Sequence, residues 1–396
     1  MNQPQSVLRS KTIIYCFIVT VMMIMGVASV TPILPTLARH FGVPTADANL
    51  IIVFFTVPGL IVTPLAGIIA DRWGAKKVLV PSLLLFGLGG VGSAFMPGFE
   101  SFLFCRFLQG AGSGAFGVLS LTIISDTVED SGLRIKALGY NNSVMSIGAA
   151  SIPLLSGVLA EISWELPLLL SSMALPLAFL VWLGMKTPPY KSAEPYLGLK
   201  AYLRATGKAI AHREVRILLL FTVINFMVIF GPLVTFYPEL ADSKFHATPF
   251  EIGMVMSSMS VGTMLVAWQI SKISRCITTR SGIIIGFATV GAGLIVLPFA
   301  GNLLLAIIPL FVMGIGQGIF APINMGCLIS RAPYEQRSGV LAANGTLVRL
   351  AQSLGPLLFG FIYTGISLQA VFYIGGGIAV LACLLAYKGL ENRYEC

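Results

Sequence analysis

Two segments of this chain are versions of one another: residues 107–159 recur, with substitutions, as residues 311–362. Equivalent positions lie 204 residues apart at first and 203 apart after a one-residue deletion. The equivalent pairs include Gly110 and Gly314, Gly112 and Gly316, Gly114 and Gly318, Asn141 and Asn344, Pro153 and Pro356, and Gly157 and Gly360. Two similar halves that cross a membrane in the same direction are related by an axis along its normal, and a site between them can open alternately to each side.

The composition places these halves in a membrane. The 396 residues are 56% hydrophobic and 10% charged, with a mean hydropathy of +0.89, and a soluble domain needs many more charges on its surface. A hydrocarbon core of about 30 Å is crossed by a helix of about 20 apolar residues. Such runs occur at 12–34, 48–70, 78–96, 101–123, 137–160, 166–185, 215–238, 251–271, 282–299, 303–328, 339–363 and 370–387. The sequence predicts an all-α integral membrane protein with twelve transmembrane helices in two pseudo-symmetric six-helix bundles.

The distribution of charge predicts the orientation. Of the 25 lysines and arginines, Arg39 and Lys244 fall on one side, Arg106 and Arg349 lie inside spans, and all the others fall on the opposite side. Because basic loops stay in the cytoplasm, both termini are expected there, and the net charge of +9 marks topology rather than nucleic-acid binding. The first apolar run is too long for a signal peptide and is predicted to be retained. The expected domains are residues 1–185, a cytoplasmic linker at 186–214, and residues 215–396.

The loop after the second run, residues 67–77, reads GIIADRWGAKK. A glycine permits a tight turn there, and an acid at a helix end needs a basic or dipolar partner. The loop resembles the signature G-x-x-x-D-R-x-G-R/K-K/R of the major facilitator superfamily at the same place between spans two and three. The resemblance implies a cytoplasmic latch that breaks as the halves rock. The matching residues are Gly67, Asp71, Arg72, Gly74, Lys76 and Lys77.

The fourth run carries Arg106 and Gln109 in the order RFLQG, which is similar to the R-x-x-Q-G signature of the same family. In that family the arginine is associated with proton coupling. By the span limits, Arg106 lies about 8 Å from the outer end, so its side chain could instead extend to the membrane surface. An arginine that stays inside a span needs polar partners to offset its cost.

The fifth run is similar to the antiporter signature of the drug-exporting branch, G-x8-G-x3-G-P-x2-G-G. It matches at Gly139, Gly148, Pro153 and Gly157, while Ile152 and Ser156 replace two glycines. Proline removes a backbone hydrogen bond and glycine permits close packing. The eleventh run repeats part of the pattern at Gly355 and Pro356. The resemblance implies an exporter with a bent helix at the moving interface; a packing helix with no transport role is the alternative.

Arg349 lies near the middle of the eleventh run, too far from either end for its side chain to reach the surface. No acid lies deep in any run, so we expect the guanidinium to meet carbonyls, water, amides or an anionic cargo. The alternative is a polar brace between helices. Other in-span polar residues that could line a cavity are Asn141, Asn142, Asn225 and Asn344. Most buried amides tie helices together at about 1 kcal/mol or less.

Several function classes are excluded by missing motifs. The three histidines fall outside the apolar runs, no cysteine spacing indicates a metal site, and no phosphate-binding G-x4-G-K-S/T loop occurs. We therefore expect no enzyme, no metal and no cofactor, with a proton gradient as the energy source. Because the first run has no acid, proton coupling would use a peripheral acid such as Asp71, Asp126 or Glu239, or the charge of the cargo.

The combined expectation is a monomeric secondary transporter of the bacterial inner membrane. It would export an amphiphilic or organic-acid small molecule by alternating access, in exchange for protons, with the lipid bilayer and not nucleic acid as its environment. The alternatives are a metabolite importer or uniporter of the same fold and, from another class, a receptor that does not transport.

Overall fold

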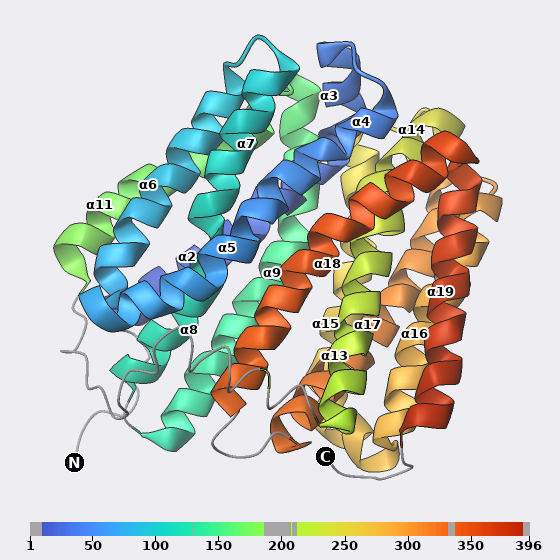
Figure 1. Cartoon of the computed structure of the whole chain (residues 1–396). Helices are drawn as coiled ribbons and strands as arrows, with labels where there is room; N and C mark the ends of the chain where they lie inside the picture. Colours follow the sequence, from blue (N-terminus) through green and yellow to red (C-terminus); the bar gives the residue numbers. More distant parts are fainter. Residues whose placement is uncertain (1–9, 129, 186–206, 208–211, 332–336, 391–396) are drawn as a thin grey trace. The chain divides into compact units, whose positions relative to one another are not determined.

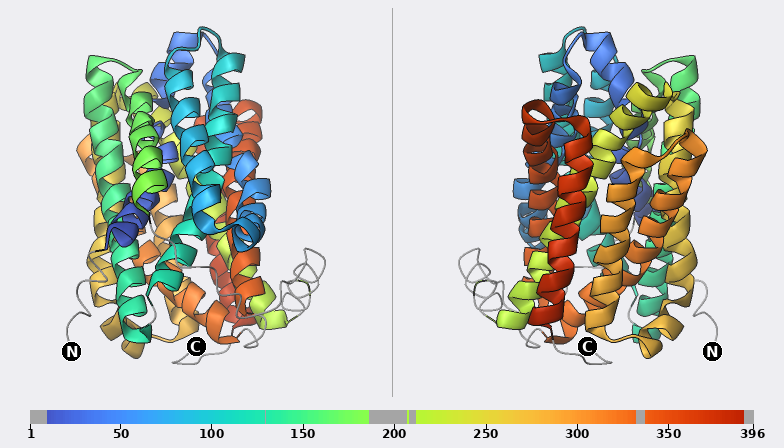
Figure 2. Two further views of the ribbon diagram at one scale, coloured as in Figure 1. Left: turned by 90° about the vertical axis from the view of Figure 1, so that its left-hand side faces the viewer. Right: turned by 90° about the vertical axis from the view of Figure 1, so that its right-hand side faces the viewer.

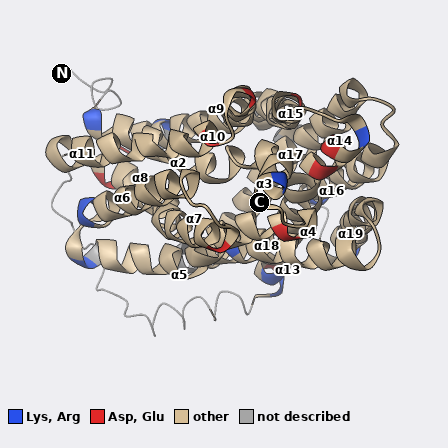
Figure 3. Ribbon diagram, turned by 90° about the horizontal axis from the view of Figure 1, so that it is seen from above, with Lys and Arg blue, Asp and Glu red and all other residues tan. Residues whose placement is uncertain are grey.

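The computed structural model describes residues 10–128, 130–185, 207, 212–331 and 337–390. These residues form helices and turns, with no strand in the described ranges (Figure 1). Twelve helical segments are long and apolar enough to cross a membrane, which confirms the number of spans predicted from the sequence. The positions of lysine, arginine, aspartate and glutamate are few and scattered along the ribbons (Figure 3), as expected for helices that lie among lipid tails.

The chain divides into two compact units. The first comprises residues 1–30 and 54–196, and the second comprises residues 31–53 and 197–396. One boundary between the units, after residue 30, falls within the first span, and another, after residue 53, falls within the second span. The segment 31–53 therefore groups with the second half of the chain. The domain boundaries predicted near residues 185 and 215 stay a prediction. The sequence did not predict that the segment 31–53 would group with the second unit.

The first unit is built from helices that run alongside one another (Figures 1 and 2). They are α2 (Lys11–Ala28), α5 (Leu50–Trp73, from Phe54 onward), α6 (Ala75–Ala94), α7 (Phe99–Gly114), α8 (Phe116–Thr127), α9 (Ser131–Ile162), α10 (Leu166–Leu169), η2 (Leu170–Met173) and α11 (Ala174–Gly184). Helix α2 packs on α8 and α9, and α6 packs on α7 and α11. Their apolar faces bury a core in which the Phe86 and Phe116 rings lie 5.2 Å apart.

The second unit has an equivalent set of helices. It contains η1 (Thr31–Ile33), α3 (Leu34–Phe41), α4 (Thr45–Ala48), α13 (Arg213–Val228), η3 (Ile229–Phe236), α14 (Tyr237–Phe245), α15 (Pro249–Cys276), α16 (Thr279–Val296), η4 (Leu297–Phe299), α17 (Leu303–Arg331), α18 (Arg337–Gly365) and α19 (Leu368–Gly389). Helix α17 packs on α15 and α16, and α18 packs on α13 and η3. The core includes the rings of Phe221, Phe287 and Phe320, which meet in tilted and edge-to-face contacts.

The internal repeat reappears as equivalent helix packing in the two units. A Cβ on Gly110 of α7 would overlap the carbonyl of Phe55, 2.7 Å from its carbon, and a Cβ on Gly314 of α17 would lie 2.8 Å from the carbonyl carbon of Met259. Only glycine permits backbones to approach this closely. Helix α7 therefore touches the backbone of α5, and α17 touches that of α15, at matching positions of the repeat.

Spans one and seven are both interrupted at equivalent places. In span one, α2 ends at Ala28 and the 3₁₀ turn η1 precedes α3; in span seven, the π-helical turn η3 lies between α13 and α14. Prolines at Pro32 and Pro232 lie within these turns, where they remove backbone donors. Single π turns inside α-helices often mark functional sites. The interruptions leave α3 and α14 as short separate helices.

Candidate functional site

Arg106 is enclosed in the first unit. Its side chain is 0% exposed, which excludes the alternative in which it extends to the membrane surface. Its Nη1 donates to Gln109 Oε1 one turn along α7, its Nη2 donates to the Gly26 carbonyl oxygen at 2.7 Å, and the guanidinium lies 4.6 Å from the Phe55 ring centroid. The two residues predicted from the fourth-span motif, Arg106 and Gln109, are thus in direct contact.

The partners of Arg106 explain how a charge is retained in the interior. Gly26 lies in the last turn of α2, just before the interruption in span one, where helix carbonyls lack intrahelical donors. The guanidinium supplies such donors, and the Phe55 ring adds a cation–π contact. No carboxylate of the described residues pairs with it, so removing these neutral partners would leave a costly unpaired charge.

The second unit contains two hydrogen-bonded groups of polar side chains between α13, α17 and α18. Asn225 and Gln317 exchange two hydrogen bonds, of 3.2 and 2.7 Å. Thr222 donates to Asn344 Oδ1 at 3.0 Å and accepts from Asn324 Nδ2 at 2.9 Å. We call these five residues the amide belt. Two predicted residues, Asn225 and Asn344, belong to it.

The first unit has only part of this arrangement. Thr20 donates to Asn141 Oδ1 at 2.7 Å, which is the counterpart of the Thr222–Asn344 bond in the repeat. The positions equivalent to Gln317 and Asn324, however, are the small residues Ser113 and Ser120. The threonine–asparagine bond between spans one and five therefore has an equivalent between spans seven and eleven. The other bonds of the amide belt occur in the second unit and have no counterpart at the equivalent positions of the first.

Asn142, also predicted as a polar site residue, is exposed and lies one position beyond the buried Asn141. Successive residues on a helix point in different directions, so the two amides do not act together. Asn141 ties α9 to α2, and Asn142 faces away from that contact.

Arg349 lies in the interior of α18. Its side chain is partly buried, and no ion pair or hydrogen bond of its guanidinium occurs among the described residues. One turn further along the same helix, Gln352 Oε1 is buried without a hydrogen-bond partner. A cation and an acceptor that both lack protein partners at this depth mark a place where a ligand or water can bind.

The loop predicted as a cytoplasmic latch has the expected turn. Gly74 adopts φ +90°, a conformation that favours glycine, between α5 and α6. Lys76 Nζ donates to the Met185 carbonyl oxygen at 3.0 Å, at the end of α11. Gly67 meets only the Val118 side chain, at 3.5 Å for an added Cβ, and Arg72 and Lys77 are exposed. The side chain of Asp71 lies outside the described residues, so the predicted latch stays a prediction.

The fifth-span residues lie along one continuous helix, α9. Gly139 is exposed with open space around it, whereas Gly148 is buried against α2, with Ile24 Cδ1 3.6 Å from an added Cβ. Pro153 and Gly157 are buried residues of α9. Their proposed part in a moving interface is not tested by these contacts.

The repeated pair on α18 approaches a neighbouring backbone closely. A Cβ on Gly355 would lie 2.8 Å from the Met227 carbonyl oxygen and 3.1 Å from the Gly231 nitrogen. The Pro356 carbonyl oxygen accepts a 3.3 Å hydrogen bond from Asn49 Nδ2. Gly355 thus permits contact between α18 and span seven, and Pro356 holds the segment before α5.

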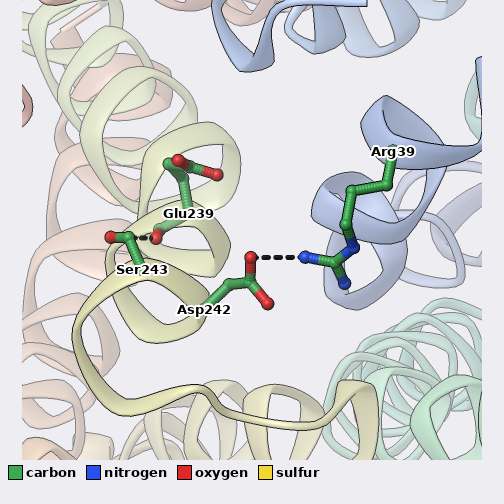
Figure 4. A network of polar contacts seen from close by, with 4 residues as sticks. All are labelled: Arg39, Glu239, Asp242 and Ser243. Atoms are coloured by element: carbon green, nitrogen blue, oxygen red, sulfur yellow. Dashed lines mark hydrogen bonds and ion pairs between the residues drawn. The ribbon is translucent and has the colours of Figure 1, made fainter. Parts of the chain in front are cut away.

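A cluster of charged and hydroxyl groups between α3, α4 and α14 was not predicted. Arg39 and Asp242 form an ion pair with 2.6 Å between Nη1 and Oδ2 (Figure 4). Glu239 lies one turn from Asp242 on α14. The Thr45 side chain lies within hydrogen-bonding reach of Glu239. The sequence contained one signal for this pairing: Arg39 and Asp242 are equivalent positions of the repeat.

A protein with twelve membrane-length helices in two similarly packed units, carrying buried polar residues, belongs to the class of membrane transporters rather than enzymes. The chain is a member of the Major Facilitator Superfamily, whose sequence model matches residues 16–243 and 218–394. The resemblance to this family, seen in the loop after the second span and in the fourth span, is thereby confirmed.

Relatives of known name cover nearly the whole chain. It is 20% identical over 372 residues to the quinolone resistance protein NorA of Staphylococcus aureus, covering 93% of this chain and 94% of the relative. It is 23% identical to the class B tetracycline resistance protein of Escherichia coli, covering 87% of each. In fold it is similar to a D-xylose–proton symporter, with a TM-score of 0.77 at 16% identity, covering 96% and 99% of the two chains.

Proposed function

We propose that the protein exports an amphiphilic or organic-acid small molecule from a bacterial cell by alternating access, in exchange for protons. The named relatives are resistance proteins against quinolones and tetracycline, which supports export and a bacterial inner membrane. The glycine and proline pattern of α9 resembles that of the drug-exporting branch and supports the same direction of transport.

The observation that carries the acidic character of the cargo is the unpaired Arg349. In the predicted span 339–363, Arg349 lies ten residues from the start and fourteen from the end, about 15 and 21 Å at 1.5 Å per residue. A side chain cannot cross either distance to water. Its charge is permanent at any physiological pH, so a polar partner within the span must stabilise it. A carboxylate of the cargo would supply that partner, with bidentate hydrogen bonds.

The proton-carrying residue is proposed to be one of the peripheral acids. Asp126 is exposed near the end of α8, and Glu239 is partly buried beside Asp242 and Thr45. The proton gradient is the proposed energy source, and no bound cofactor takes part. The proposed functional unit is a monomer.

The test uses inside-out membrane vesicles and norfloxacin, a quinolone that carries a carboxylate, with its methyl ester as the counterpart that lacks the carboxylate charge. Energised vesicles should accumulate norfloxacin, and collapse of the pH gradient should abolish this. Arg349→Gln should reduce norfloxacin uptake about tenfold or more, since a hydrogen bond to a charged group contributes about 1.5–3 kcal/mol, and should leave uptake of the ester nearly unchanged.

Arg280→Gln is the matched control, because Arg280 lies in the same unit with its guanidinium 3.7 Å from the Tyr387 ring centroid, at the ends of α16 and α19. Full norfloxacin transport by Arg349→Gln would overturn the acidic-cargo assignment. Absence of uptake of norfloxacin, of its ester and of a panel of drugs in energised vesicles would overturn export altogether.

A second candidate function is import or uniport of a metabolite, favoured by the likeness in fold to a D-xylose–proton symporter. The same vesicles distinguish the two functions. In inside-out vesicles with an acidic interior, protons that leave down their gradient drive substrate inward if the protein is an antiporter. A symporter would move substrate in the same direction as the proton, and a uniporter would only equilibrate it. A receptor that does not transport would bind a labelled ligand without accumulation.

A further inference from the structure

The helices α6 and α16 begin in the same way, but the cation in the first turn of each has a different partner. They begin at Ala75 and Thr279, which are 204 residues apart, the offset of the internal repeat. The second residue is Lys76 in α6 and Arg280 in α16. Lys76 Nζ donates to the Met185 carbonyl oxygen at 3.0 Å, at the end of α11. The first unit thus uses this cation within its own fold.

Arg280 has an aromatic ring as its partner instead. Its guanidinium carbon lies over the ring of Tyr387, near the end of α19, 3.7 Å from the ring centroid. A ring holds a guanidinium through its face, and the N–H donors, which lie in the guanidinium plane, stay available at its edge. No hydrogen bond or ion pair of this guanidinium occurs among the described residues. Arg280 is therefore held in place with donors that can bind an oxyanion at two points.

Two more cations lie at the adjoining helix ends. Lys388 follows Tyr387 and is exposed. The next residue, Gly389, packs against α13, because a Cβ added to it would lie 3.5 Å from Ile217 Cδ1. Arg216, which precedes Ile217, is also exposed. The right-hand view of Figure 2 shows these ends side by side, with α13 in yellow-green and α19 in red.

The charge of these helix ends is not balanced by nearby acids of the described residues. At this end of the second unit those residues include one acid, Glu214, and its Oε2 lies 3.5 Å from Arg331 Nη1. Arg216, Arg280 and Lys388 form no ion pair with the described residues. Such a surplus of positive charge attracts anions over about 8 Å at physiological ionic strength.

Exposed leucines continue from the cations along the same helix faces. Seven and four positions before Lys388 are Leu381 and Leu384, and four positions after Arg216 is Leu220, all of them exposed. Residues at this spacing lie above one another on a helix. A phospholipid has the same order of groups, with a charged headgroup at the membrane surface and acyl chains along the spans, whereas a soluble anion would use the cations alone.

We propose that the ends of α13, α16 and α19 form a binding site for one anionic phospholipid. Arg280 binds the phosphate with two N–H donors, Tyr387 is the positioning residue for its guanidinium, and Arg216 and Lys388 add attraction. The charge distribution predicts that this end faces the cytoplasm, where basic residues meet anionic lipid. The lipid binds the folded protein and stabilises it, and it has no part in cargo binding.

The test measures lipid binding to the purified full-length protein by native mass spectrometry in detergent. The two probes are dioleoyl phosphatidylglycerol and dioleoyl phosphatidylcholine, which share their acyl chains and differ in headgroup charge. The dissociation constant of the first bound lipid should be at least about tenfold lower for phosphatidylglycerol, at about fivefold for each cation. Arg280→Gln and Lys388→Gln should each raise it about fivefold for phosphatidylglycerol and leave it unchanged for phosphatidylcholine.

Lys272→Gln is the matched control. Lys272 is an exposed cation at the same end of the second unit, but it lies on α15, which packs mainly on α17. Its removal should leave both dissociation constants unchanged. Tyr387→Leu should weaken phosphatidylglycerol binding as Arg280→Gln does, whereas Tyr387→Phe keeps the ring and should keep the affinity. Gel filtration confirms that each variant is folded.

Three results would overturn the lipid site: equal dissociation constants for the two lipids, equal effects of Arg280→Gln and Lys272→Gln, or weakened binding in Tyr387→Phe equal to that in Tyr387→Leu. A melting curve distinguishes lipid from free phosphate. Phosphatidylglycerol should raise the melting temperature, and inorganic phosphate in molar excess should not; the same rise with phosphate would also refute a lipid site.

Lipid binding is measured without transport, and the inference requires only that the protein lies in a membrane. It is therefore independent of the proposed function. Tight phosphatidylglycerol binding by a protein that moves no tested compound would leave the lipid site standing and remove the proposed export. Energised norfloxacin uptake by a protein that does not distinguish the two lipids would do the opposite.

Discussion

The close approach of α7 to α5 makes a sharp prediction for Gly110→Ala. A Cβ at this position would overlap the Phe55 carbonyl oxygen and lie 2.7 and 2.9 Å from the carbonyl carbon and Cα of Phe55. All three are backbone atoms, so no side-chain rotation relieves the overlap and the helices must separate. Added atoms in a packed interior cost about 1–3 kcal/mol, which corresponds to a melting temperature lower by about 2–4 °C per kcal/mol in a unit of this size.

The assay is thermal unfolding of the purified protein in detergent, followed by intrinsic fluorescence. Gly314→Ala should have a similar effect, because its Cβ would meet the Met259 backbone in the same way. Gly139→Ala is the control: nothing lies within 4 Å of its added Cβ, and alanine favours the helix by about 1 kcal/mol. A melting temperature of Gly110→Ala equal to or above that of Gly139→Ala would refute the reasoning.

Two further predictions concern buried polar groups. Thr222→Val should lower the melting temperature about twice as much as Thr20→Val, because Thr222 bonds two amide side chains and Thr20 bonds one, at about 0.6 kcal/mol each; equal losses would contradict this. Arg106→Lys should destabilise the protein by about 1–3 kcal/mol, since one ammonium cannot replace the fork that bonds Gln109 and Gly26. Arg280→Lys, at a helix end, is the control. An equal melting temperature for the two variants would contradict a stabilising role for the two hydrogen bonds of the Arg106 guanidinium.

Much of the architecture could be predicted because its causes are local in the sequence. Apolar runs of sufficient length define the spans, and the glycine pattern that Gly110 shares with Gly314 predicted equivalent packing in the two halves. For Arg106, the sequence predicted the proximity of Gln109 but not the contact that keeps the side chain buried. Spacing placed them on one helix face, but the carbonyl of Gly26 that holds the charge inside comes from a distant span.

The contacts of the segment 31–53 could not be predicted in the same way. Periodicity describes each span as one helix, whereas the interruptions at η1 and η3 depend on prolines whose effect varies with their neighbours. The pairing of Arg39 with Asp242 needs those interruptions to place α3 beside α14. The amide belt likewise depends on which faces of α13, α17 and α18 meet, and the sequence identified Asn225 and Asn344 without their bonds.

Neither Arg106 nor Arg349 pairs with a carboxylate of the described residues, and this has an electrical consequence. Each guanidinium is a fixed positive charge inside a span, so the membrane voltage acts on it with about 2.3 kcal/mol per charge per 100 mV of potential crossed. If the transport cycle moves both by a tenth of the membrane's thickness, a voltage of 100 mV shifts the balance of conformations by about 0.5 kcal/mol. The cell's resting potential would then adjust the turnover of this protein even when its cargo carries no net charge.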